Sequence, residues 1–193
     1  MNARVVASLF DSAAGAGTAA SPLKIVGVYA DLPAHVLATS VLRNVARNCS
    51  TVCNLTSVWW SFDMLTSVSV RETASRVAAE ADMIWCSTHA CEALPDRVTS
   101  WMEAWLPHQQ ASDGALVALL RCPRDYQVEK SPSRAYLIQA AQSAGMELFV
   151  QRFDCDCRQS FHFPHRASFL TENPWVIAEW PNSHQIRGWG INE

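Results

Sequence analysis

Five residues spread along the sequence carry side chains suited to polar chemistry: Asp31, Ser87, Thr88, His89 and Arg121. Each lies where a run of apolar residues ends, which is where a strand of a parallel sheet gives way to its loop. These groups can bind a small polar molecule, and an imidazole can also move a proton. They therefore predict a small-ligand site if the fold brings their strand ends together. The alternative is an ordinary hydrophilic rim in which His89 caps the next helix.

A second group, Cys155, Cys157, His162 and His165, places four potential metal ligands close together in the sequence. Thiolates and imidazoles are the ligands of structural zinc, and a metal would order a segment that has no apolar period of its own. The Cys-x-Cys spacing is tighter than the usual zinc pattern, so chance placement in a loop is the alternative. The hypothesis is a structural zinc site without an open position for catalysis.

Cys86 and His89 together suggest a nucleophile and its base, with Asp31 orienting the imidazole. A spacing of three residues at a strand end rarely brings a thiol and an imidazole into contact. The glycines of a nucleophile elbow are also missing on either side of Cys86. The sequence therefore favours a buried structural cysteine at this position.

Apolar runs without alternation predict buried parallel strands, while capping residues and prolines predict the starts of the helices between them. Five strands are expected, at 23–30, 52–62, 83–85, 114–120 and 146–153. Helices are expected after Asp31 and Pro33, at the S-x-x-E capping box Ser69–Glu72, after Pro95, and after Ser131-Pro132.

Regular alternation of strands and helices, joined by right-handed crossovers, predicts an α/β domain with a parallel sheet between helices on both faces. The expected fold is three-layer and flavodoxin-like (Rossmann-like), with five strands in the order 2-1-3-4-5. The predicted domain covers residues 23–153. Residues 1–22 are expected to be a flexible leader, and residues 154–193 an irregular C-terminal extension packed on the domain.

The third helix and its loop resemble the flavodoxin and flavin-reductase superfamily, in which a small residue and a proline precede a helix with an inward aromatic residue. Ala93-Leu94-Pro95 and Trp101 stand in those places, and Thr88–Leu94 would face a flavin ring. The resemblance implies flavin mononucleotide (FMN) as cofactor and a flavin-dependent oxidoreductase activity.

The loop after the first strand, Ala30–His35, departs from that superfamily, whose members wrap the flavin phosphate with a Ser/Thr/Gly-rich loop. Here Asp31 would repel a phosphate, and Pro33 removes one N–H donor. The sequence therefore favours a small-ligand-binding or interaction module without a recognisable catalytic motif. A flavin-dependent oxidoreductase with an atypical phosphate loop is the alternative.

The chain also resembles a group of bacterial proteins to which no activity is attached. The shared features are Trp60-Ser61-Phe62-Asp63, a helix of the form LP…W…WL, and the ending Trp-Gly-Ile-Asn-Glu at 189–193. This resemblance implies a bacterial origin and a common fold, and it implies no reaction.

Composition excludes several classes of function. The net charge of −3 and the scattered Lys and Arg residues predict no binding to nucleic acid or to an anionic membrane. No apolar run approaches the roughly 20 residues of a membrane span.

Seven cysteines, an odd number, in a chain of 193 residues predict reduced thiols and a cytoplasmic location. Exposed tryptophans at Trp59, Trp60 or Trp180 would favour a homo-oligomer.

Overall fold

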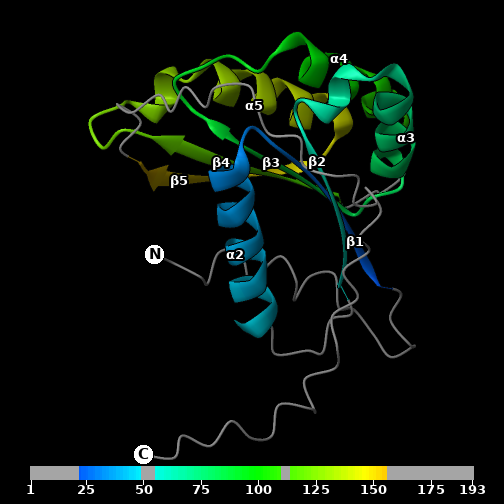
Figure 1. Cartoon of the computed structure of the whole chain (residues 1–193), viewed down its shortest axis with the longest axis horizontal. Coiled ribbons are helices and arrows are strands. Elements are labelled where there is room, and N and C mark those ends of the chain that lie inside the picture. Colours follow the sequence, from blue (N-terminus) through cyan, green and yellow to red (C-terminus); the bar gives the residue numbers. More distant parts are fainter. Residues whose placement is uncertain (1–21, 49–54, 110–113, 156–193) are drawn as a thin grey trace, which may run out of the picture.

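The structure is a computed structural model that describes residues 22–48, 55–109 and 114–155 (Figure 1). The strands are β1 (Leu23–Tyr29), β2 (Leu55–Ser61), β3 (Met83–His89), β4 (Ala115–Cys122) and β5 (Glu147–Asp154). The helices are α2 (Leu32–Asn48), α3 (Val68–Ala79), α4 (Asp96–Trp105) and α5 (Pro132–Ala144). Short 3-10 helices are η1 (Met64–Thr66), η2 (Leu106–His108) and η3 (Val128–Lys130).

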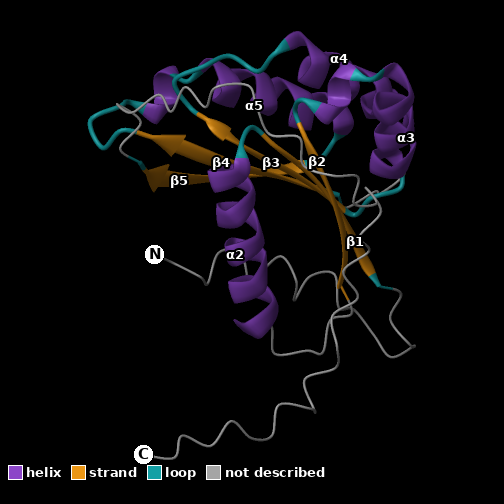
Figure 2. Cartoon of the chain, in the orientation of Figure 1, coloured by secondary structure: helices purple, strands orange, loops and turns teal. Residues whose placement is uncertain are grey.

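All five strands are parallel and form one sheet in the order β2-β1-β3-β4-β5, which confirms the predicted topology. Every strand therefore ends at the same edge of the sheet, which we call the carboxyl edge. Figure 2 shows the sheet between helices on its two sides, the three-layer arrangement expected from the sequence. The order in which strands are added to the sheet reverses at β1, because β2 lies on one side of β1 and β3 lies on the other.

The two faces of the sheet are covered unequally by the described helices. Helices α3, α4 and α5 lie on one face, and α2 lies alone on the other (Figure 1). The residues of α4 at helical spacing, Val98, Trp101, Met102 and Trp105, are fully buried against the first face. On the second face, the apolar side of α2 packs with the side chains of β1, β2 and β3, including Trp85. Each face thus has its own apolar core.

β1 is an interior strand, paired with β2 on one side and β3 on the other, and its residues Ile25–Val28 are buried. Gly27 is required at its position because the ring of Trp59 on β2 lies directly over it. A Cβ atom at residue 27 would lie 2.0 Å from Trp59 Cε3 and 2.1 Å from Cζ3, far inside van der Waals contact. The glycine therefore makes room for an aromatic ring on the α2 side of the sheet.

Two of the predicted helix signals act as expected. Asp31 caps α2, because its Oδ1 accepts a hydrogen bond from the Ala34 N–H at 2.7 Å. Ser131 caps α5 by accepting from the Arg134 N–H at 3.1 Å, and Gly145 ends that helix in the left-handed region with φ of 66°. The two N-cap bonds hold the loops that follow β1 and β4 in defined conformations.

The capping box predicted at Ser69–Glu72 is wrong. Helix α3 already begins at Val68, and its N-cap residue is Ser67, whose carbonyl accepts from the Arg71 N–H at 2.9 Å. The Ser69 hydroxyl lies within hydrogen-bond distance of the Ser67 hydroxyl, at 3.1 Å, and does not cap the helix. The helix begins two residues earlier than predicted, because η1 ends at Thr66 and Ser67 leads directly from it into α3.

The expectations for the leader and the C-terminal extension concern residues that lie outside the described part of the chain, apart from residue 22 and Asp154–Cys155. Within the described ranges, none of the helices has the length and apolar character that crossing a membrane requires.

Candidate functional site at the carboxyl edge

Three of the predicted site residues meet at the carboxyl edge, on the side of the sheet that α2 covers. His89 ends β3 and lies beside Arg121 of β4 in the strand register. Asp31 follows β1 and begins α2. Because β1, β3 and β4 are neighbours in the sheet, three residues far apart in sequence converge at one place. We refer to Asp31, His89 and Arg121 as the charged cluster.

The Asp31 carboxylate is the centre of the charged cluster. Its Oδ2 lies 2.9 Å from His89 Nε2, and its two oxygens lie 3.2 and 3.4 Å from Arg121 Nη1. Oδ1 also accepts the N–H of Ala34, as described above. A carboxylate accepts only, so the imidazole bears its proton on Nε2 in this arrangement. Two side chains and one backbone amide therefore surround a single anionic group.

The surroundings of Asp31 favour its ionised form. Partial burial by itself would raise its pKa. The hydrogen bonds from His89 and the Ala34 N–H, with the charges of His89 and Arg121, outweigh that effect and lower the pKa of Asp31 below 3.8. Asp31 is therefore an anion throughout the physiological pH range, and the cluster keeps a permanent charge pair.

Arg121 has more donors than the cluster uses. Its side chain is only 17% exposed, and Nη1 makes its hydrogen bonds to Asp31. Within the described residues, the guanidinium makes no other hydrogen bond, although it carries five N–H groups. The Asp31 and His89 side chains are 40% and 25% exposed, so solvent reaches the cluster. A second anion could therefore approach Arg121 from outside.

The other two predicted site residues do not join the charged cluster. Ser87 is fully buried, and its hydroxyl donates to the Ala34 carbonyl at 2.9 Å, which ties β3 to the first turn of α2. Thr88 is buried, and because side chains alternate along a strand it faces the α5 side of the sheet. Ser87 thus holds the first turn of α2, which follows Asp31, against β3, whereas Thr88 lies on the opposite face of the sheet from the cluster.

Cys86 lies on the same side of β3 as Thr88, opposite to His89. It is fully buried, and this burial raises its pKa to about 12. A thiol that stays protonated at neutral pH is a poor nucleophile. The arrangement therefore does not pair Cys86 with His89, and it agrees with a structural role for the cysteine.

Of the predicted zinc ligands, Cys157, His162 and His165 lie outside the described residues. Cys155 follows β5 and is disulfide-bonded, so it could act as a zinc ligand only after reduction. This bond also departs from the expectation of reduced thiols, which holds for Cys86, Cys91 and Cys122. Among the described residues, no group of three or more His, Cys, Asp or Glu side chains is placed to hold a metal. The zinc site stays a prediction.

Beside the charged cluster lies an aromatic stack that the sequence analysis missed. The rings of Tyr29 and His35 are stacked with centroids 4.4 Å apart, and Trp59 contacts His35 from β2 at 5.8 Å. Burial lowers the pKa of His35, so its imidazole is neutral at neutral pH. The only signal in the sequence was the position of His35 four residues after Asp31, on the first turn of the helix.

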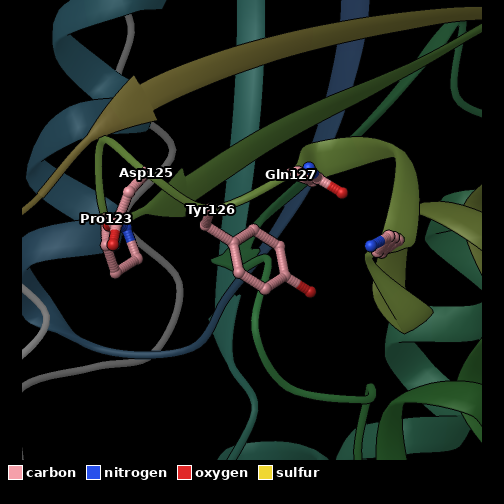
Figure 3. Close-up of a pocket in the computed structure, with 5 residues that line it drawn as sticks. Pro123, Asp125, Tyr126 and Gln127 are labelled. Atoms are coloured by element: carbon pink, nitrogen blue, oxygen red, sulfur yellow. The ribbon is translucent and has the colours of Figure 1, made fainter.

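A second missed feature is a hollow of about 350 Å³ on the α5 side of the carboxyl edge. It is lined by Pro123, Asp125, Tyr126, Gln127 and Lys130, all from the segment between β4 and α5. Figure 3 shows the Tyr126 ring standing between Pro123 and Asp125 on one side and Gln127 on the other. Sequence reasoning had no means of finding it, because the segment has no motif and its shape depends on distant residues.

The charged cluster offers an anchored guanidinium, an oriented imidazole and a carboxylate, which are groups for binding and for proton transfer. Comparisons of the chain with models of protein families, with curated proteins and with solved structures found no match to any of the three.

Proposed function

We propose that this protein binds a small anionic molecule at the charged cluster, on the α2 side of the carboxyl edge. The observation that carries the proposal is the partly used guanidinium of Arg121, mostly buried and held by Asp31, with further N–H donors directed to no described partner. In open α/β sheets, ligands bind beyond the carboxyl ends of the strands where the strand order reverses. The cluster spans the ends of β1, β3 and β4 and so includes the reversal between β1 and β3.

The chemistry of the cluster defines the class of ligand. A carboxylate or phosphate group would bind to the remaining donors of Arg121, because planar guanidinium groups pair with two oxygens at once. Asp31 stays ionised and would repel a second anion placed close to it. The ligand should therefore also carry a hydroxyl, amide or amine group that donates to Asp31.

A binding assay on the intact protein tests the proposal. A panel of small hydroxy-carboxylates, amino-carboxylates and sugar phosphates is titrated by calorimetry, after mass spectrometry of any molecule that co-purifies under native conditions. Arg121→Gln should weaken a bound ligand by about 10- to 100-fold, the size of one charged hydrogen-bonded contact of about 1.5–3 kcal/mol. His89→Gln should weaken it less, because the amide keeps a donor to Asp31.

Arg124→Gln is the matched control. Arg124 is 90% exposed and pairs with Asp154 away from the cluster, so its loss removes the same charge without touching the site. Equal weakening by Arg121→Gln and Arg124→Gln would show a general charge effect and contradict the site. Binding by no member of the panel, together with no co-purified anion, would also overturn the proposal.

The flavin-dependent oxidoreductase is the less favoured function. A flavin phosphate needs free N–H donors at the start of a helix, and the Asp31 carboxylate already accepts the Ala34 N–H there. Protein that purifies with stoichiometric FMN, identified by its visible absorption and its mass, would replace our proposal with this one.

We also propose a cytoplasmic location. Cys86, Cys91 and Cys122 are free thiols, as is usual in a reducing compartment. The disulfide of Cys155 is the exception. Rapid alkylation at cell lysis should therefore label Cys155 as well, and a disulfide there that survives in freshly lysed cells would place the protein in an oxidising compartment.

A further inference from the structure

The hollow between β4 and α5 is built from a loop that the rest of the domain holds in place. Arg152 of β5 donates to the backbone carbonyls of Pro123, Arg124 and Tyr126, with distances of 2.9 Å to Pro123 and 3.2 Å to Tyr126. The Tyr126 hydroxyl donates to the Ala90 carbonyl at 3.2 Å. The Arg152 guanidinium on β5 and the bond from the Tyr126 phenol to Ala90, just after β3, thus fix the loop from both sides of β4, which makes the hollow a preformed feature.

Two opposite charges line this hollow without pairing with each other. Asp125 and Lys130 both border it. Within the described residues, neither side chain takes part in an ion pair or a hydrogen bond. The ring of Tyr126 stands between the Pro123–Asp125 side and Gln127, as seen in Figure 3. The hollow therefore has a carboxylate, an ammonium group and an aromatic surface, all available to a bound molecule.

The charges define which ligand fits. A simple anion would be attracted by Lys130 and repelled by Asp125, and a simple cation would be attracted by Asp125 and repelled by Lys130. A zwitterion satisfies both groups at once. The aromatic surface of Tyr126 adds an apolar contact and favours an ammonium group at its face. The volume of about 350 Å³ is at the small end of the range for ligand pockets, so the hollow is suited to a small molecule.

We propose that this hollow is a second binding site, specific for a small zwitterion with an apolar side chain, such as a free α-amino acid. The ligand's carboxylate lies toward Lys130, its ammonium group toward Asp125, and its side chain against Tyr126 and Pro123. The site is separate from the charged cluster, because Tyr126 packs with the core on the α5 side of the sheet and the cluster lies on the α2 side.

Three probes that share a phenylethyl group separate the contributions of the two charges. L-phenylalanine carries both charged groups, phenethylamine only the ammonium group, and 3-phenylpropionate only the carboxylate. Each is titrated into the intact protein, and binding is followed by the backbone amide NMR signals of residues 123–130. Phenylalanine should bind about fivefold or more tightly than either of the others, the effect of one exposed ion pair of about 1 kcal/mol.

Variants that remove one charge of the hollow should each change the preference for phenylalanine over a different probe. Asp125→Asn should abolish the advantage of phenylalanine over 3-phenylpropionate, and Lys130→Gln its advantage over phenethylamine. Both side chains are exposed, so neither change should affect folding. Glu129→Gln, in the same 3-10 helix but outside the hollow, is the matched control and should change nothing.

Several outcomes would overturn the second site. Equal affinity of the three probes would remove the zwitterion requirement, and signals that shift elsewhere in the domain would move the site. No binding at millimolar concentrations would reject it. Arg121→Gln should leave phenylalanine binding unchanged. If that variant alone weakened it, phenylalanine would be bound at the charged cluster, and the proposed function would stand while the second site fell.

Discussion

Replacing Gly27 by alanine should destabilise the protein through a single, identifiable collision. The new Cβ would lie 2.0 Å from Trp59 Cε3, where real carbon atoms keep well over 3 Å. Trp59 cannot simply swing aside, because its ring contacts Trp85 at 6.1 Å and His35 at 5.8 Å between centroids. Either the ring or the backbone of β1, which is paired on both sides, must move.

The magnitude follows from two opposing effects. Forcing extra atoms into a packed core costs about 1–3 kcal/mol. Replacing glycine by alanine within a strand recovers about 0.5–1 kcal/mol of conformational entropy. Because β1 is an interior strand paired on both sides, we expect a cost near the upper end of the first range and a net loss of about 2 kcal/mol. For a domain of this size, that corresponds to a fall in Tm of about 4–8 °C.

Urea denaturation of a double-mutant cycle with Trp59→Val gives the direct test. With the ring removed, the alanine at position 27 should cost less than about 0.5 kcal/mol. Gly145→Ala is the control, since no atom lies within 4 Å of its Cβ and its cost would come from the positive φ alone. That cost should be the same with or without Trp59. A Gly27→Ala protein as stable as the wild type, or equally destabilised in the Trp59→Val background, would refute the reasoning.

Three further predictions concern residues around the two sites. Burial lowers the pKa of His35 from its ordinary value of 6.5, so as the pH falls the imidazole is protonated more readily in the unfolded chain than in the folded protein. The free energy of unfolding should therefore fall as the pH drops below 6.5. His35→Phe keeps the ring stacked on Tyr29 and should flatten that part of the pH profile measured by denaturation. Ser131→Ala removes the N-cap of α5 and should cost about 1 kcal/mol in the same assay, with an unchanged value contradicting the cap. Arg152→Gln removes the donors to three carbonyls and should speed hydrogen exchange at residues 123–127, while exchange in β1 stays as it was.

The sequence was sufficient to predict the arrangement of strands and the meeting of Asp31, His89 and Arg121. Apolar runs mark buried strands, right-handed crossovers leave few strand orders, and carboxyl ends of neighbouring strands lie together. Thr88 was placed wrongly, since a strand turns successive side chains to opposite faces. The phase of β3, which puts Ser87 and His89 on one side and Thr88 on the other, is set by packing on both faces.

The second site was beyond prediction for a different reason. Its loop has no repeating pattern, and its shape depends on Arg152 of β5 and on Ala90, the residue that follows β3. Such long-range side-chain-to-backbone bonds leave no periodic mark in the sequence. The same is true of Trp59, whose ring position explains Gly27 only once β1 and β2 are seen in register.

The position of β1 between β2 and β3 has a consequence for how the chain is made. β1 is the first of the five strands to be synthesised, and its two partners in the sheet are residues 55–61 and 83–89. It therefore cannot be paired on both sides until His89 has left the ribosome. Until then an apolar, β-branched segment has open hydrogen-bonding edges, the state most prone to aggregation. Pairing of such distant segments is also slow. Nascent chains halted before residue 83 should therefore bind chaperones more strongly than chains halted after β4, and the commitment to the native sheet should occur when β3 arrives.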